Sequence, residues 1–335
     1  MHHTTQSPGK YLQAATAIAL LTGCLLAIPV VASTAITDIT INRAVVSQLA
    51  AFPETSVETL AFSPDSLTLA CGLGDGRLLL MDVQSGSTIL ASELHEAAIT
   101  ALSYSPDGQW LASSDINGRV IVWDAKTGET VTSWDLGLAV HDVAFSPQGT
   151  WLACVGAMRS VLMWEAGTWE RLPSINGHTG SVYSFAISPE EDLLVTGAGD
   201  ADPTIRVWSL PDGVQLRTDL YEGRVHDIEY SSKDKHTAIT GTQMTISLWE
   251  VDRAEYLHLI FGFRGTPQDA AYSSRGNALV AVDDAGALRF LRVPSWYERR
   301  KISFDEALSA VDYSYDRLYI ACGDAAGTVF LLTVP

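Results

Sequence analysis

The feature that most constrains this sequence is a marker dipeptide that returns seven times. An aromatic residue or isoleucine followed by serine recurs about every 42 residues, at Phe62-Ser63, Tyr104-Ser105, Phe145-Ser146, Ile187-Ser188, Tyr230-Ser231, Tyr272-Ser273 and Tyr313-Ser314. A second marker follows each of them, at Met81, Trp123, Trp164, Trp208, Trp249, Leu291 and Leu332. Two markers in constant register indicate one structural unit repeated seven times, in which neighbouring units share a core.

Each unit contains four short runs that predict β-strands. In the unit from Ala98 to Trp134, the runs are rich in valine, isoleucine, leucine and aromatic residues. The turns between them are Ser105-Pro106-Asp107-Gly108, Asn117-Gly118 and Lys126-Thr127-Gly128. The third run, Val120-Ile121-Val122-Trp123, is apolar on both faces, which is typical of a strand in a sheet covered on both sides. The pattern predicts an all-β fold of stacked four-stranded antiparallel sheets.

These units resemble those of WD-repeat (WD-40 type) β-propellers. Trp123-Asp124 matches the dipeptide that names the family, Trp164-Glu165 and Trp249-Glu250 are near variants, and Gly177-His178 matches its Gly-His pair. The resemblance covers roughly Ala44 to the C-terminus and implies a seven-bladed propeller, in a bacterial-type exported member of the family. The blade units are expected near 57–91, 95–135, 138–175, 178–219, 224–261, 267–303 and 308–335, within one domain spanning residues 36–335.

The last unit supplies only three strands. It ends at Val329-Phe330-Leu331-Leu332 and Pro335, so its outermost strand must come from elsewhere. The segment 44–50 is strand-like and belongs to no unit. The resemblance implies that this segment pairs with the last blade and closes the ring, which removes exposed sheet edges.

The family also implies a hydrogen-bonded network in each blade that joins a His, a Ser or Thr, an Asp and a Trp. The fourth unit supplies His178, Thr196, Asp202 and Trp208. The second unit supplies His95, Ser113 and Trp123, with Asn117 at the place of the Asp and Asp115 as a substitute for it. Cys71, Cys154 and Cys322 replace the hydroxyl in other units, and we expect them to be buried thiols without disulfides.

The N-terminal segment predicts export. Lys10 precedes an apolar run from Ala14 to Ala32, and small residues Ser33-Thr34-Ala35 follow it, which is typical of a cleaved signal peptide. Two alternatives remain for residues 1–35. The motif Leu21-Thr22-Gly23-Cys24 resembles a lipobox, so that Cys24 would be lipidated, or residues 14–35 could stay uncut as a membrane anchor. The expected location is periplasmic or extracellular, with membrane contact only through this segment.

Composition limits the partners. The formal net charge of -18 disfavours nucleic acid, which is bound chiefly by clustered lysine and arginine. Hydrophobic residues make up 47% of the chain, as in a globular domain. We therefore expect a protein or peptide partner, no nucleic acid, and a monomeric propeller.

Candidate partner-binding residues lie at the starts of the first strands of consecutive units. They are His141, Asp142, Tyr183, Arg224, His226, Asp227, Gln268 and Asp269. The three aspartates each precede the first marker by three residues, so ring symmetry predicts an acidic arc near one mouth of the central channel. The alternative is that they are solvated strand ends that keep an acidic protein soluble.

No catalytic or metal constellation is complete. Adjacent residues on a strand point to opposite faces, so His141 cannot pair with Asp142, nor His226 with Asp227, although a His and an Asp of different blades could meet. Asp200 and Asp202 alone fall short of a calcium site and predict a turn. We expect neither a metal nor a cofactor.

A local basic cluster is the last feature. Its members are Arg289, Arg292, Arg299, Arg300 and Lys301, beside Trp296 and Tyr297. One interpretation is a patch that contacts a partner. The alternative is that Trp296 simply covers the outer edge of its blade, as Trp169 is expected to do in the third unit. These observations favour a non-catalytic scaffold that presents rim loops to a protein partner outside the cytoplasm. The alternatives are a propeller hydrolase or lyase with its groups at the channel mouth, and a membrane-tethered accessory subunit.

Overall fold

The computed structural model describes residues 46–233, 236–251 and 255–334. The predictions made for residues 1–35, including Cys24, therefore concern residues outside this range, as do Ala44 and Val45 of the closing segment. Within the described ranges, no helix has the length and apolar character needed to cross a membrane.

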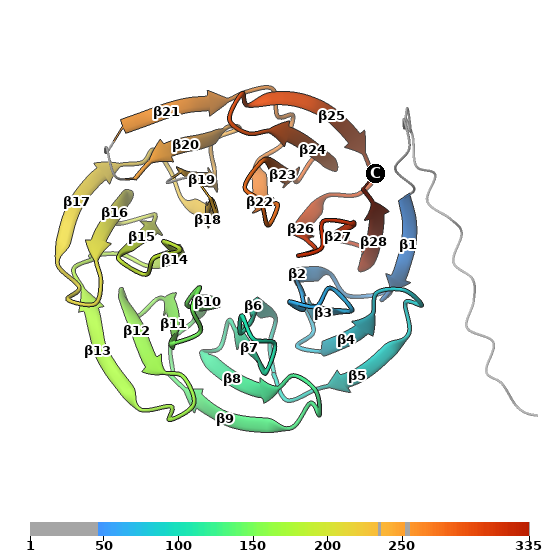
Figure 1. Ribbon diagram of the computed structural model, residues 1–335, viewed down its shortest axis with the longest axis horizontal. Helices are drawn as coiled ribbons and strands as arrows, with labels where there is room; N and C mark the ends of the chain where they lie inside the picture. The colour runs from blue at the N-terminus through green and yellow to red at the C-terminus, as the bar shows by residue number, and fades with distance from the viewer. Residues whose placement is uncertain (1–45, 234–235, 252–254, 335) are drawn as a thin grey trace, which may run out of the picture. The chain divides into compact units, whose positions relative to one another are not determined.

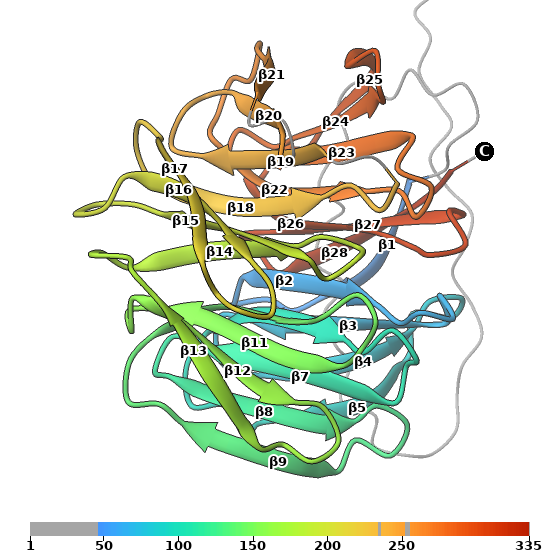
Figure 2. The ribbon, with the colours of Figure 1, turned by 60° about the vertical axis from the view of Figure 1, so that its left-hand side comes forward.

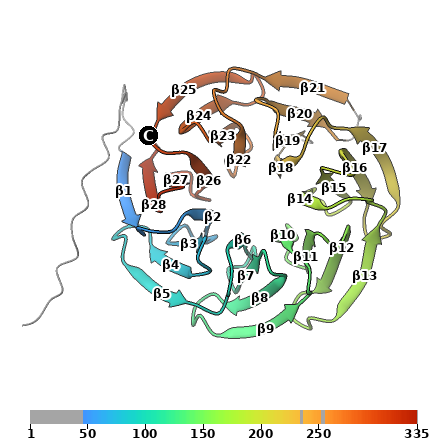
Figure 3. The same ribbon diagram turned by 180° about the vertical axis from the view of Figure 1, so that it is seen from behind.

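The described chain forms seven four-stranded antiparallel sheets that follow one another around a ring (Figure 1). Seen from behind, the same ring shows one strand of each sheet at the centre and one at the periphery (Figure 3). The predicted seven-bladed all-β propeller is confirmed.

The strands of each blade run from the centre outward. The innermost strands are β2 (Val57–Phe62), β6 (Ile99–Tyr104), β10 (Val140–Phe145), β14 (Val182–Ile187), β18 (Val225–Tyr230), β22 (Pro267–Tyr272) and β26 (Leu308–Tyr313). The second strands are β3 (Thr68–Leu73), β7 (Trp110–Asp115), β11 (Trp151–Gly156), β15 (Leu193–Ala198), β19 (His236–Gly241), β23 (Ala278–Asp283) and β27 (Tyr319–Asp324). The third strands are β4 (Leu78–Asp82), β8 (Arg119–Asp124), β12 (Ser160–Glu165), β16 (Thr204–Ser209), β20 (Ile246–Glu250), β24 (Ala287–Arg292) and β28 (Thr328–Thr333). The outermost strands are β5 (Thr88–Ser92), β9 (Thr130–Asp135), β13 (Arg171–Asn176), β17 (Gln215–Leu220), β21 (Glu255–Ile260), β25 (Tyr297–Ser303) and β1 (Val46–Ala51).

The N-terminal strand closes the ring. β1 pairs antiparallel with β28, in a register that places Val46 opposite Leu332 and Ala51 opposite Thr328. The seventh blade thus combines the last three strands of the chain with its first, as Figure 1 shows. The closing strand implied by the resemblance is confirmed, and it extends one residue beyond the expected end, to Ala51.

The hydrophobic core lies between blades. In one cluster, Leu60 and Cys71 of the first blade pack with Ala321 and Leu331 of the seventh, and Leu49 of β1 covers them. In the side view of Figure 2 the blades stack as layered sheets. Each sheet therefore needs both neighbours to cover its faces, which explains the apolar third strand of every unit.

The serine of the first marker fixes the hairpin between the first and second strands. Ser105 Oγ accepts a hydrogen bond from the Trp110 N–H at 2.8 Å and donates one to Asp107 at 2.6 Å. Gly108, in the same turn, adopts a φ of 72°, which favours glycine. In the fourth blade Ser188 Oγ accepts from the Leu193 N–H at 2.9 Å. Six of the seven marker serines accept this bond, and Ser231 accepts one from the Lys233 N–H, so the marker recurs because its side chain sets the first turn of the blade.

Every innermost strand carries a β-bulge near its start. The pairing register shifts between the first and third residues in all seven blades, so the second residue has no partner across the ladder. A bulge re-aims a side chain and ends regular pairing. These second residues are His141 in β10, Tyr183 in β14, His226 in β18 and Gln268 in β22, with three counterparts in the other blades.

Candidate functional site

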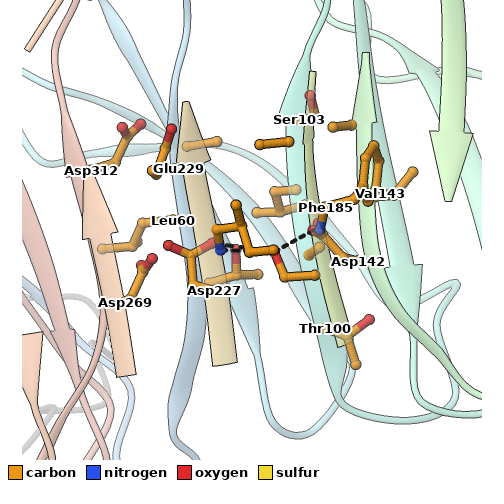
Figure 4. Close-up of a pocket in the computed structure, with 18 of the residues that line it drawn as sticks. Leu60, Thr100, Ser103, Asp142, Val143, Phe185, Asp227, Glu229, Asp269 and Asp312 are labelled. Atoms are coloured by element: carbon orange, nitrogen blue, oxygen red, sulfur yellow. Dashed lines mark hydrogen bonds between the residues drawn. The ribbon is translucent and has the colours of Figure 1, made fainter. Parts of the chain in front are cut away.

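The seven innermost strands enclose a central channel with a cavity of about 520 Å³. We call the end at which these strands begin the front mouth. The second residues of the strands form it: Glu58, Thr100, His141, Tyr183, His226, Gln268 and Ser309. Figure 4 looks into this cavity and shows carboxylates from several strands directed toward one space.

Five carboxylates line the channel behind the mouth residue Glu58. Asp142, Asp227 and Asp269 are third residues of their strands, whereas Glu229 and Asp312 are fifth residues. Side chains two residues apart share one face of a strand, so both sets lie on the same side. The third-position aspartates are the arc expected from the sequence, and each is partly buried, with only part of its surface open to the channel. Glu229 and Asp312 were not anticipated, although this two-residue spacing could have pointed to them.

Three of these carboxylates bind the backbone of the next blade. Asp142 Oδ2 accepts from the Phe185 N–H at 3.1 Å, and Asp269 Oδ2 accepts from the Val311 N–H at 2.7 Å. Asp312 Oδ2 accepts from the Phe62 N–H at 2.7 Å. The inner edge of each blade would otherwise leave such amides without a partner, which is costly in a buried position.

Two serines replace the carboxylate in the same role. Ser103 Oγ accepts from the Phe145 N–H at 3.0 Å, and Ser184 Oγ accepts from the Ile228 N–H at 3.0 Å. Ser184 also donates to Asp142 Oδ2 at 3.0 Å. The inner strands are therefore linked from blade to blade by side chains that satisfy their free amides.

Burial raises the pKa of every channel carboxylate. It raises the pKa of Asp142 to about 6 and the pKa values of Asp269 and Asp312 to about 7. For Asp227 and Glu229, burial and then the charge of nearby Asp269 raise the pKa well above its usual range. The charges of neighbouring carboxylates thus add to the effect of burial at Asp227, Glu229 and Asp269.

Aromatic and basic side chains cluster at the front mouth. The rings of His141 and Tyr183 stack with their centroids 4.6 Å apart, and the Arg224 guanidinium lies 4.7 Å from the centre of the Tyr183 ring. The Tyr183 hydroxyl donates to Asp200. The structure therefore brings these predicted residues together at one side of the mouth.

The other predicted mouth residues use backbone partners. His226 Nδ1 lies 3.1 Å from the Pro267 carbonyl oxygen, and Gln268 Nε2 donates to the Thr266 carbonyl at 3.0 Å. Burial lowers the pKa of both His141 and His226, and the charge of Arg224 lowers it further. Both imidazoles are therefore neutral at neutral pH. Among the described residues, neither imidazole forms a hydrogen bond with a carboxylate.

The two family networks lie between strands of the blades, away from the channel lining. His178 Nδ1 lies 2.8 Å from Asp202 Oδ2, and Thr196 Oγ1 lies 2.7 Å from His178 Nε2 and accepts from Trp208 Nε1 at 2.8 Å. Asp202 also accepts from Thr204 and Arg206, so this carboxylate has a structural role.

In the second blade the same geometry uses Asp115 and not Asn117. Asp115 Oδ2 lies 2.7 Å from His95 Nδ1, and Ser113 Oγ lies 2.7 Å from His95 Nε2 and accepts from Trp123 Nε1 at 2.9 Å. Asp115 is the last residue of β7, while Asn117 lies in the turn beyond it and is exposed. The last residue of the second strand therefore supplies the carboxylate of this network.

The basic cluster of the sixth blade is not one surface patch. Arg289 is 6% exposed, donates to Glu298 and to the Phe261 carbonyl, and lies 4.1 Å from the centre of the Phe263 ring. Trp296 packs against the core between the fifth and sixth blades. The tryptophan is thus part of the packing of the blade edge, as is Trp169, whose ring centroid is 5.1 Å from that of Trp110.

Metal and thiol chemistry receive no support from the described part of the chain. It contains no group of three His, Cys, Asp or Glu side chains placed to hold a metal ion. Cys71, Cys154 and Cys322 are buried and free, and burial raises the pKa of the Cys154 thiol to about 12.

The loops around the front mouth expose large apolar side chains, a feature that the sequence reasoning missed. These loops lead into the innermost strands or join the second strands to the third. The exposed residues are Leu94, Ile116, Leu138, Met244 and Phe261 in these loops and Leu220 at the end of β17, each at least 42% exposed. Together with the mouth residues they form what we call the front face. Its apolar side chains belong to blades on both sides of the His141 and Tyr183 stack.

Comparison with known proteins agrees with this architecture. Residues 46–82, 87–124 and 169–209 match the family described as WD domain, G-beta repeat. The chain is 28% identical over 159 residues to transcription initiation factor TFIID subunit 5 of Caenorhabditis elegans, covering 46% of this chain and 24% of that protein. It is 32% identical over 91 residues to eukaryotic translation initiation factor 3 subunit I of Schizosaccharomyces pombe, covering 26% and 27%.

A third relative has a similar relationship. Anaphase-promoting complex subunit cdc20 of Dictyostelium discoideum is 29% identical over 119 residues, covering 35% of this chain and 24% of that protein. The chain thus spans about a quarter of the length of each of these three relatives. All three come from eukaryotes, which gives no support to a bacterial-type exported member.

Proposed function

We propose that this chain, a seven-bladed propeller of the WD40-repeat family, is a non-catalytic scaffold that binds a protein or peptide partner on its front face. The observation that carries the proposal is the gathering of exposed apolar side chains around a mouth of aromatic and polar residues. Apolar anchors surrounded by polar groups are typical of protein interfaces. The relatives described above are named as subunits of larger factors or complexes, which agrees with a scaffold role.

A matched pair of double variants tests this proposal. Leu138→Ser with Phe261→Ser removes two apolar residues of the front face, which are 50% and 64% exposed. Leu67→Ser with Leu318→Ser removes two residues of the opposite face, which are 64% and 51% exposed. We expect the front variant to retain at least about tenfold less of the partner recovered from native cells, and the opposite variant to retain it fully. Equal retention by both variants would contradict the proposal.

A propeller enzyme is the second candidate. The raised pKa values of the channel carboxylates favour it, because perturbed groups in a cavity are often catalytic. However, Asp142, Asp269 and Asp312 already bind backbone amides, which gives them a structural role. A hydrolase screen in which turnover is abolished by His141→Ala or His226→Ala would replace the scaffold with an enzyme.

We further propose that the scaffold works outside the cytoplasm, as a periplasmic or secreted monomer or through an anchor at its N-terminus. Support comes only from the apolar run of residues 14–32 and the small residues after it. An anchored form would be an accessory subunit that holds its partner at a membrane. Cell fractionation, with an intact mass of the mature protein, distinguishes a cleaved signal from a lipidated Cys24 and from an uncut segment.

A further inference from the structure

We propose that the channel receives a cationic side chain, an arginine or a lysine, of the partner that the front face binds. This inference rests on the proposed function and names the chemistry of the partner. It would make the front mouth a site for a basic peptide segment, anchored by apolar contacts around the mouth.

The first argument is charge. Glu58 lies at the mouth of the cavity, and deeper in it are Asp142, Asp227, Glu229, Asp269 and Asp312, whereas no lysine or arginine of the described chain lines it. Surface charge of one sign inside a cavity with low-dielectric walls concentrates ions of the opposite sign. The lining therefore favours a positive partner group over a neutral or negative one.

The second argument is independent of the charge count. Asp227 Oδ2 is fully buried and accepts no hydrogen bond from the described residues. Its Oδ1 accepts a long hydrogen bond of 3.4 Å from Ser184 Oγ, and the Ala270 backbone amide also lies near the carboxylate and favours its charged form. A buried carboxylate oxygen without a donor is destabilising, which indicates that a donor is brought from outside. Glu229 lies two residues further along β18, and Figure 4 shows both carboxylates in the cavity.

The third argument concerns the shape of the cation. No three of the described acidic, His or Cys side chains are close enough together to hold a metal ion. A guanidinium or ammonium group carries several N–H donors and can bridge carboxylates of different strands. The third residues lie about 3 Å inside the second, and the fifth residues about 10 Å inside them, at the usual rise of a strand. A long side chain that enters from the front mouth can therefore reach Asp227 first and then Glu229.

The mouth itself is compatible with a cation. His141 and His226 are neutral at neutral pH, because burial and Arg224 lower the pKa of each, so they do not repel a positive group. Arg224 lies over the Tyr183 ring and is not part of the cavity lining. Burial and then the charge of Asp269 raise the pKa of Asp227, and a nearby cation would favour its charged form.

The test uses three acetylated and amidated peptides of sequence Gly-X-Gly, in which X is arginine, lysine or citrulline. Citrulline has nearly the shape of arginine without its charge. Binding to the full propeller is measured by calorimetry at low salt. We expect the arginine or the lysine peptide to bind at least tenfold more tightly than the citrulline peptide. Comparable binding of all three, or no binding by any, would overturn the inference.

Protein variants locate the cation. Glu229→Gln keeps the size of the side chain and one carbonyl oxygen, and it removes a carboxylate from the channel. Glu129→Gln makes the same change at an exposed position between β8 and β9. We expect E229Q to weaken binding of the charged peptide at least fivefold and E129Q to leave it unchanged. Equal weakening by both would mean that only net charge matters and would refute a channel site.

The two proposals fail separately. If the native partner is lost from the front-face double variant but is retained by E229Q, the scaffold stands and the cationic anchor is wrong. If the native partner is retained by the front-face variant, the proposed function itself is wrong, whatever the peptides do.

Discussion

At the scale of single residues, the channel carboxylates serve the fold at an electrostatic cost. Asp269 and Asp312 each satisfy a backbone amide of the next blade at 2.7 Å. They do so in a buried and negatively charged space, which raises the pKa of each to about 7. The folded protein therefore retains protons that the unfolded chain has released.

The sign of the resulting pH effect follows from this shift. An unfolded aspartate has a pKa of about 3.9, so the unfolded chain loses its proton first as the pH rises. The stabilising contribution of Asp312 is complete below about pH 4 and is lost as the pH rises toward its folded pKa of about 7. We expect the free energy of unfolding to fall over this range.

Asp312→Asn tests the effect, since the amide oxygen can still accept from Phe62. The free energy of unfolding is measured with urea at pH 5 and at pH 8 for the variant and for the natural protein. The difference between the two proteins should shift in favour of the variant by on the order of 2 kcal/mol from pH 5 to pH 8. Glu129→Gln, an exposed neutralisation, should show no such gain. If the free energies of unfolding of D312N and the natural protein differ by the same amount at both pH values, the pKa of Asp312 is not raised in the folded protein.

At the scale of the strand, β1 is the element that converts a row of blades into a ring. It covers the edge of β28, whose sequence Thr328–Thr333 is largely apolar, and Leu49 packs against the core shared by the first and seventh blades. An uncovered apolar edge strand is prone to pair with other chains.

Deletion of residues 44–50 should therefore lower the melting temperature by roughly 10 °C or more and produce soluble oligomers. Differential scanning calorimetry and size-exclusion chromatography measure the two effects. Deletion of residues 37–43, of equal length, is the control and should change neither. An unchanged melt of the first deletion would mean that β1 does not carry the closure.

Much of the fold at this scale could be predicted from the sequence. The Phe-Ser or Tyr-Ser marker records a turn whose serine binds its own hairpin, as Ser105 does, so local chemistry repeats with the blade. The closing strand was predictable because the last unit lacks a strand. The site was harder to predict: Glu229 and Asp312 occupy a position that is alanine in most blades, and the role of Asp312 depends on the Phe62 amide of the next blade.

The bulges explain what else was missed. Period-two alternation predicts that neighbours such as His141 and Asp142 face apart, but it does not show that His141 is the unpaired residue of a bulge aimed at the mouth. The apolar front face could not be predicted from the sequence either. Leu138 and Phe261 lie in loops of different blades, which only the closed ring places on one face.

At the scale of the whole molecule, the ring has two faces of different character. The front face combines exposed apolar loops with the aromatic and polar front mouth, and acidic side chains fill the channel behind it. A rigid closed ring presents these groups in a constant arrangement, which suits recognition of one partner. The central claim is that this face, and not the opposite one, binds that partner.

Site-specific photo-crosslinking in native cells tests this claim most directly. A photoreactive phenylalanine analogue replaces Leu138 or Phe261 on the front face, and Leu67 or Leu318, of similar exposure, on the opposite face. We predict that mass spectrometry identifies the same partner attached at both front positions and at neither opposite position. A partner attached equally well at Leu67 and Leu318, or attached only there, would contradict the account.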